Sequence, residues 1–134
     1  MKGPTCTRTM LACSIGIFFA VSAHATDING AWVKNVKDWS KRSSICSRAL
    51  LKENNKIVTY ENGVVIIDGN EIRGKSAVCH IKARKDDGNF VRLLVDCPAE
   101  IAENLFELRV DGPDELTRIF SGLQMNTTYF RCPQ

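Results

Sequence analysis

Four cysteines carry the clearest chemical signal in this chain. The 134 residues include six cysteines, of which Cys46, Cys79, Cys97 and Cys132 lie beyond residue 25. They are widely spaced and form no Cys-x-x-Cys pair, so a zinc site is disfavoured. Oxidation to two disulfides is the chemistry that such cysteines indicate in an exported chain. Three pairings are possible, and we favour Cys79–Cys97 with Cys46–Cys132.

His80 is the one histidine beyond residue 25 and the first candidate for a general base. Such a base needs a nucleophile or carboxylate beside it, and the sequence contains no Gly-x-Ser-x-Gly, His-Glu-x-x-His or phosphate-binding glycine loop. Asp86–Asn89 is acidic but lacks the alternating oxygen ligands of a calcium loop. We therefore expect no catalytic residue, no metal and no cofactor. A small hydrolase centred on His80 is kept as an alternative.

The first 25 residues have the pattern of a secretory signal peptide. Lys2 and Arg8 precede the apolar run Met10–Val21, and Ala23–Ala25 is a small-x-small cleavage site. The run is too short to span a bilayer comfortably, so we expect no transmembrane segment after cleavage. Residues 26–134 would then form a single secreted domain of 109 residues, located in the periplasm or outside the cell.

Charge is balanced overall but unevenly distributed. Without the leader's Lys2 and Arg8, 16 of the 18 basic residues remain against 15 acidic ones, which argues against nucleic acid as a partner. One segment, which we call the basic face, concentrates positive charge in Lys34, Lys37, Lys41, Arg42, Arg48 and Lys52. A solvated surface, or pairing with the acidic segment 96–115, explains it most simply. The alternative is docking on an acidic partner or lipid headgroup.

Residues 76–97 read as a β-hairpin in which each strand contributes one cysteine. Alternation places both cysteines on the apolar face, together with Ala77, Ile81, Ala83, Val91, Leu93 and Val95. Asp87-Gly88 suits a tight turn. Setting Cys79 opposite Cys97 requires one extra residue, which we place in the turn at 86–89.

The remaining chain predicts short strands and a little helix. A helix over Ile45–Glu53, capped by Ser43 or Ser44, competes with a strand over Ile45–Leu51. One helical turn is expected within Pro98–Asn104. The predicted strands are Lys56–Tyr60 and Gly63–Asp68, joined as a hairpin by Asn62-Gly63, then Leu105–Val110, Leu116–Phe120 and Thr127–Cys132. Roughly seven strands in all indicate a mainly β, disulfide-stapled domain, either a small antiparallel barrel or a sandwich.

The chain resembles small exported proteins of alphaproteobacteria at single residues spread over positions 30–133. They are Gly30-x-Trp32, Cys46, Ile72-Arg73-Gly74, Cys79-His80-Ile81, Asp96-Cys97, Leu116-Thr117-Arg118 and Tyr129-Phe130-Arg131-Cys132-Pro133. Most such proteins have no assigned activity, and some are effectors that a type IV machine delivers to host cells. Gly30-x-Trp32 also resembles the start of lipocalin-like barrels, although a turn followed by a core tryptophan is the simpler interpretation.

These observations predict a non-enzymatic exported protein that binds a protein, a glycan or a lipid. The first alternative is a virulence effector that engages a host factor, with the basic face as its contact surface. The second alternative is an inhibitor of a host hydrolase such as lysozyme or a protease.

Overall fold

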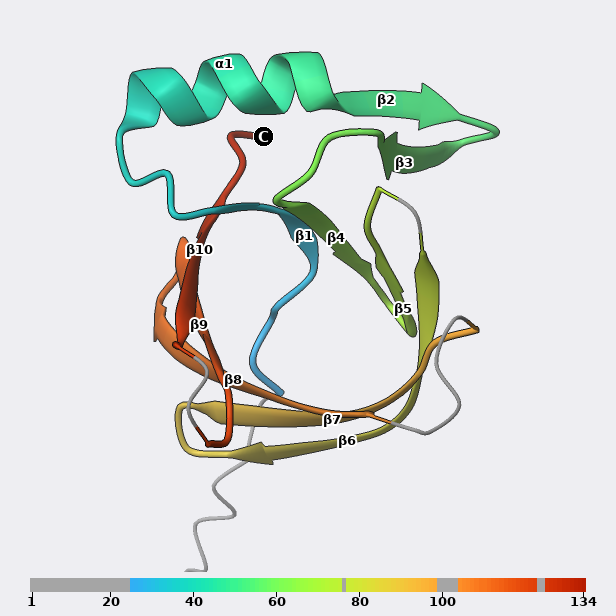
Figure 1. Ribbon diagram of the computed structural model, residues 1–134, viewed down its shortest axis with the longest axis vertical. Helices are drawn as coiled ribbons and strands as arrows, with labels where there is room; N and C mark the ends of the chain where they lie inside the picture. The colour runs from blue at the N-terminus through green and yellow to red at the C-terminus, as the bar shows by residue number, and fades with distance from the viewer. Residues whose placement is uncertain (1–24, 76, 99–103, 123–124) are drawn as a thin grey trace, which may run out of the picture.

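The computed structural model describes residues 25–75, 77–98, 104–122 and 125–134. Within them the chain forms one helix and ten strands (Figure 1): β1 (Gly30–Lys34), α1 (Trp39–Ala49), β2 (Leu50–Glu53), β3 (Lys56–Thr59), β4 (Val64–Asp68), β5 (Glu71–Arg73), β6 (Val78–Asp87), β7 (Phe90–Asp96), β8 (Asn104–Gly112), β9 (Glu115–Ile119) and β10 (Thr127–Arg131).

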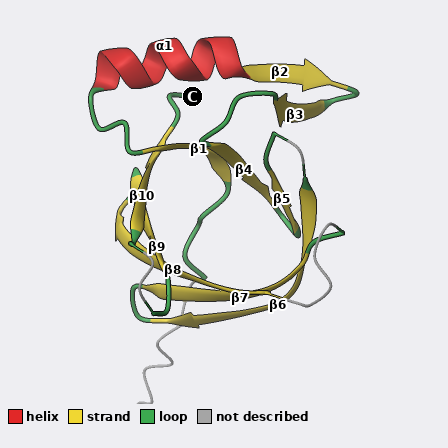
Figure 2. Ribbon diagram, in the orientation of Figure 1, coloured by secondary structure: helices red, strands yellow, loops and turns green. Residues whose placement is uncertain are grey.

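Eight of these strands close into an antiparallel barrel. Their order around it is β1-β10-β9-β8-β7-β6-β5-β4, and β1 closes the ring by pairing with both β10 and β4. Apart from that closure, neighbours in the barrel are neighbours in sequence. Figure 2 shows the ring of strands with α1 and the separate β2–β3 pair outside it, on one side. The predicted mainly β fold is confirmed, as a barrel rather than a sandwich.

Two apolar clusters hold this arrangement together. The first fills the barrel and consists of Ile28, Trp32, Ile67, Ile72, Cys79, Val91, Leu93, Val95, Cys97, Leu108 and Leu116. The second lies between the outer face of the barrel and α1 and consists of Val33, Cys46, Ala49, Val64, Phe130 and Cys132. Strand β1 contributes to both clusters, because the neighbouring side chains of Trp32 and Val33 point to opposite faces of the sheet.

The hairpin of β6 and β7 has the predicted register but not the predicted turn. His80 pairs with Asp96, so Cys79 lies opposite Cys97, and the two form a disulfide with an S–S distance of 2.05 Å. Asp87 pairs with Phe90, which leaves a tight two-residue turn. The extra residue lies instead in the strand, as a bulge between Ile81 and Ala83.

This bulge changes which residues of β6 face inward. Beyond it, Arg84 pairs with Leu93 and Asp86 pairs with Val91, both fully buried residues. Directly paired residues share a face of the sheet, so Arg84 and Asp86 lie on the inner side. The prediction that Ala83 shares the face of Cys79 is therefore wrong, because a bulge shifts the alternation by one residue.

The hairpin predicted at Asn62-Gly63 is also wrong. β3 pairs with β2, whereas β4 pairs with β1 and β5. The true turn is Asn54-Asn55, whose φ angles of 49° and 63° are left-handed. Asparagine tolerates this region better than other side chains, so the turn forms without glycine.

The helix begins earlier than predicted. Asp38 caps it, since its carboxylate accepts a hydrogen bond of 2.9 Å from the Lys41 amide. Neither Ser43 nor Ser44 is the cap, and the chain changes to strand β2 at Leu50. The disulfide Cys46–Cys132, with an S–S distance of 2.03 Å, ties α1 to the end of the chain as predicted.

The later strands lie close to their predicted positions. β8 starts at Asn104 and continues to Gly112, β9 starts at Glu115, and β10 ends at Arg131. The three-residue strand β5 was not predicted, because its residues read as part of a turn. The helical turn predicted within Pro98–Asn104 falls mostly on residues 99–103, outside the described residues. No helix in the described part of the chain is long and apolar enough to cross a bilayer.

Candidate functional site: a closed barrel end and a cavity

One end of the barrel is closed by the segment that precedes β1. Ile28 in this segment is buried, and its carbonyl accepts a hydrogen bond of 3.0 Å from the Trp32 indole. The guanidinium of Arg131 lies 4.3 Å from the centre of the Trp32 ring. The same guanidinium donates to the carbonyls of Asn29, Asp27 and Pro113. An arginine stacked on a core tryptophan thus ties the segment across the barrel end.

Gly30 allows this close approach. It opens β1 rather than forming a turn, and its φ is 133°. A Cβ at this position would lie 2.8 Å from the Nη1 atom of Arg131, closer than real Cβ contacts come. Residues with a side chain rarely adopt this φ. Glycine is therefore required here for two separate reasons.

A charged pair on β6 holds the start of the same segment. Arg84 contacts Asp86 at 2.6 Å and donates to the Thr26 carbonyl, while the Thr26 amide donates to Asp86 at 2.9 Å. The hydrogen bond from Arg84 lowers the pKa of Asp86, and the Thr26 amide lowers it further, against the opposing effect of burial. The β6 bulge is what places this pair on the inner side of the sheet.

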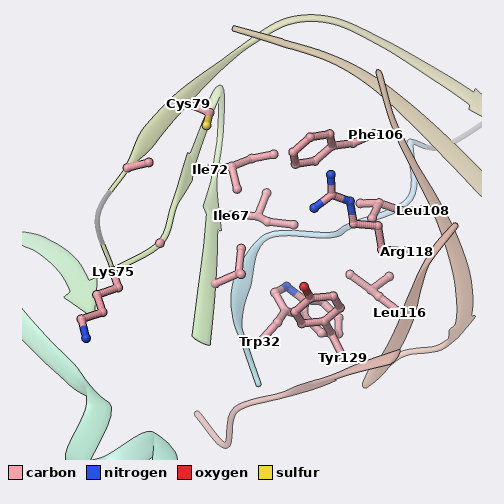
Figure 3. A pocket seen from close by; sticks show the side chains of 13 residues that line it. Trp32, Ile67, Ile72, Lys75, Cys79, Phe106, Leu108, Leu116, Arg118 and Tyr129 are labelled. Atoms are coloured by element: carbon pink, nitrogen blue, oxygen red, sulfur yellow. The ribbon is translucent and has the colours of Figure 1, made fainter. Parts of the chain in front are cut away.

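The rest of the barrel interior contains a cavity of about 210 Å³. Figure 3 shows its lining, which comprises Trp32, Val65, Ile67, Ile72, Gly74, Lys75, Ala77, Cys79, Phe106, Leu108, Leu116, Arg118 and Tyr129. The lining residues Gly74, Lys75 and Ala77 belong to the connection between β5 and β6, at the end opposite to the closed one. An eight-stranded barrel is just wide enough to hold one small ligand or to be filled by its own side chains.

Arg118 is a charged side chain that reaches into this cavity. Along β9, Leu116 and Arg118 share the inner face, and Arg118 pairs with the inward-facing Leu108. Its guanidinium carbon lies 3.7 Å from the centre of the Phe106 ring and 4.5 Å from that of Phe120. Sequence analysis did not select Arg118 as a site residue, although its alternation with Leu116 was the available signal.

His80 contributes neither to the closed end of the barrel nor to the lining of the cavity. It is exposed on β6 next to Cys79, and because Cys79 lines the cavity, the neighbouring side chain points outward. Its cross-strand partners are Asp96 and Glu71. Within the described residues, no group of three or more histidine, cysteine or acidic side chains could hold a metal ion.

The six residues of the predicted basic face do not all lie on the surface. Lys34, Lys37, Lys41, Arg48 and Lys52 are exposed, and Arg48 lies 3.7 Å from Glu61. Arg42 is buried, with its guanidinium 5.1 Å from the Trp39 ring and 5.8 Å from the Phe130 ring. Arg42 is therefore not part of an exposed face, because α1 turns it toward the barrel wall.

The acidic segment finds other partners than the basic face. Glu107 pairs with Arg92 at 2.7 Å and Asp111 with Arg109 at 2.6 Å, on the same or neighbouring strands. Among the ion pairs of the described residues, none joins the acidic segment to the basic face. The predicted mutual pairing of these segments is not found there.

The fold and cavity define a class: an eight-stranded antiparallel barrel, closed at one end, with a small apolar cavity that contains an arginine. Comparisons with protein-family models, with curated proteins and with solved structures gave no match for this chain. The two disulfides are consistent with a location outside the reducing cytoplasm. Function must therefore be inferred from the site itself.

Proposed function

We propose that this is an exported binding protein that holds one small, mostly apolar molecule inside its barrel. The observation that carries the proposal is the 210 Å³ cavity, lined largely by aliphatic and aromatic side chains. An engineered apolar cavity of about 150 Å³ suffices to bind benzene. Binding, rather than catalysis, fits a lining in which no nucleophile lies beside a base.

Export rests on separate support. The leader has a positive start, an apolar run and a cleavage site, and the two disulfides need an oxidising compartment to form. Mass mapping of the secreted protein should find Thr26 at the N-terminus and both bridges intact. A retained leader with four free thiols would overturn this part of the proposal.

Trp32 offers a direct test of binding because it lines the cavity, whereas Trp39, the other tryptophan, is 60% exposed. In a Trp39→Phe protein, saturable changes in Trp32 fluorescence on adding 1-hexanol would report occupancy of the cavity. Binding to the native state also raises thermal stability. Both signals are expected, with the same dissociation constant.

A matched pair of variants locates the binding. Ala77→Phe would place a ring in the cavity that Ala77 lines, whereas Leu105→Phe adds the same ring at a position that is 65% exposed. We expect Ala77→Phe to abolish the hexanol response and Leu105→Phe to retain it, with unchanged circular dichroism in both. Equal responses of the two variants, or no saturable binding to the parent, would refute the proposed function.

Engagement of a host factor or a hydrolase by the basic face stays a prediction, now restricted to the five exposed lysine and arginine residues. No contact among the residues that the structure describes favours it over binding in the barrel.

A further inference from the structure

We infer that Asp86 is a binding site for the α-ammonium group that cleavage after Ala25 creates at Thr26. The inference rests on the leader cleavage in the proposed function and adds what the new chain end does, which is to complete the closed end of the barrel. The observation behind it is the position of one backbone nitrogen, which lies against a carboxylate of β6.

The Thr26 nitrogen already lies where an ammonium group would bind. The segment before β1 reaches β6 (Figure 1), and this nitrogen is 2.9 Å from Oδ2 of Asp86. Arg84 holds the same carboxylate with two hydrogen bonds, of 2.6 Å to Oδ1 and 2.8 Å to Oδ2. Arg84 also donates to the Thr26 carbonyl. The carboxylate is therefore fixed in place, with one oxygen facing the nitrogen that cleavage releases.

Cleavage changes the charge of this nitrogen without requiring it to move. Hydrolysis of the Ala25–Thr26 bond by a leader peptidase adds the hydroxyl of a water molecule to the Ala25 carbonyl carbon and its proton to the Thr26 nitrogen. At neutral pH most of the resulting amine takes up one more proton from solution and becomes an ammonium ion. Ala25 is exposed, so the bond lies at the surface. A neutral donor thereby becomes a charge-assisted one, which binds a carboxylate roughly twice as strongly.

The new positive charge balances the charged groups around the nitrogen. The hydrogen bond from Arg84 to Asp86 raises the pKa of the guanidinium against the opposing effect of burial, and the nearby carboxylate of Asp27 raises it further. Two carboxylates thus face one guanidinium, and the ammonium group neutralises the excess negative charge. Arg131 and Asp114 line the same surface pocket as the start of the segment, but they pair with each other at 3.6 Å and add no net charge.

This ion pair acts on the segment that closes the barrel. Ile28, two residues after Thr26, is 1% exposed and belongs to the same cluster as Trp32. Local opening of such a segment begins at its free end, where few contacts hold the chain. A charged contact at the new N-terminus therefore lowers the population of open states. The processed chain closes the barrel more firmly than a chain in which this nitrogen is a neutral amide.

Titration of the α-amine tests the contact in the secreted protein. Peptide mapping first establishes that the chain begins at Thr26. We expect its α-amine to titrate above the ordinary range of about 7.7–8.0, because the ionised carboxylate favours the ammonium form. Acylation of the α-amine at pH 7, followed by mass spectrometry of the N-terminal peptide, should be at least about threefold slower in the parent than in Asp86→Asn. Asp87→Asn, at the exposed neighbouring position, should match the parent.

A chain that keeps Ala25 separates the ion pair from other effects. In a protein that begins at Ala25, the ammonium group lies one residue further out and Thr26 keeps a neutral amide. Exchange of the Ile28 amide should be at least about threefold faster in this protein than in the one that begins at Thr26. In the Asp86→Asn background the added residue should change this rate by less than about 1.5-fold, because the two changes remove the same contact.

The possible outcomes separate this inference from the proposed export. Equal acylation rates in the parent and in Asp86→Asn, with a chain that begins at Thr26, would overturn the inference and leave export and cleavage standing. A retained leader, or a chain that begins at another residue, would refute both the cleavage site and the inference. If Asp86→Asn does not fold, the two chain starts decide, and equal exchange of the Ile28 amide overturns the inference.

Discussion

Two arginine side chains stack on aromatic rings in different parts of the barrel, and their surroundings differ. At the closed end Arg131 stacks on Trp32 and donates to three backbone carbonyls of two loops. Away from the closed end, Arg118 stacks on Phe106 and Phe120, and it lines the cavity. The first arginine joins two loops to β10, and the second lines the cavity. What differs is the element that each guanidinium faces, which is a backbone segment at one end and the cavity at the other.

The largest expected effect is the loss of folding stability when each of the two arginines is replaced by methionine. Arg131→Met should lower the free energy of unfolding by about 3 kcal/mol, because it leaves several carbonyls without a donor. Arg118→Met should lower it by less, about 1 kcal/mol, since methionine keeps apolar contact with the rings of Phe106 and Phe120. Urea denaturation followed by circular dichroism measures both. Equal losses would mean that the two arginines have the same structural role.

A second pair of variants isolates the closed end. Gly30→Ala should cost about 2–3 kcal/mol, because the new Cβ meets Arg131 and the φ of 133° is strained. Gly69→Ala should cost only about 1 kcal/mol, because Gly69 also has a positive φ, of 58°, but a Cβ there has open space around it. Similar losses at the two positions would contradict the extra cost expected at Gly30 from the close approach to Arg131 and the φ of 133°.

The smallest effect is pH-dependent and concerns Asp86. Because the folded state lowers the pKa of Asp86 below its ordinary value of 3.8, the ionised carboxylate stabilises the fold above that value. This contribution is lost as the pH falls through the lowered pKa. Asp86→Asn should reduce stability at pH 7 by about 1 kcal/mol and flatten this acid dependence.

Hydrogen exchange of the closing segment localises the effect. In the parent protein, protection of the Asp27 and Ile28 amides should decrease below about pH 4, whereas Asp86→Asn should remove most of the protection already at neutral pH. Asp87→Asn, at the exposed neighbouring position, serves as the control and should behave as the parent does. Unchanged protection in Asp86→Asn would show that the carboxylate does not hold this segment.

Local patterns in the sequence predicted the parts of the fold that depend on near neighbours. The alternation around Cys79 and Cys97 was sufficient to pair them, because a two-residue period determines which side chains share a face. The same two-residue period assigned the wrong face to the residues after Ile81, because the bulge there has no distinct sequence signal. Asn54-Asn55 was overlooked in favour of Asn62-Gly63, because glycine is the stronger turn former and pairing with β2 decides the outcome.

The cavity depends on contacts between residues far apart in the chain, and these the sequence pattern did not reveal. Arg118 and Phe106 lie on the inner face of neighbouring strands, yet nothing local distinguishes that face from the outer one at a charged position. The roles of Gly30 and Arg131 depend on each other across the whole length of the domain. From the sequence, Gly30 and Trp32 were interpreted as a turn and a core residue, and Arg131 gains its role only when β10 comes beside β1.

The bulge in β6 shifts the alternation of inward-facing and outward-facing side chains by one residue between the two halves of the strand. Cys79 and Ile81 face inward in the first half, and Arg84 and Asp86 do so in the second. Deletion of Lys82 would remove the extra residue and leave a regular strand in which Ile81, Arg84 and Asp86 share the inner side, with Arg84 and Asp86 still opposite Leu93 and Val91. One strand therefore supplies an apolar wall to the cavity and a charged clamp to the closed end.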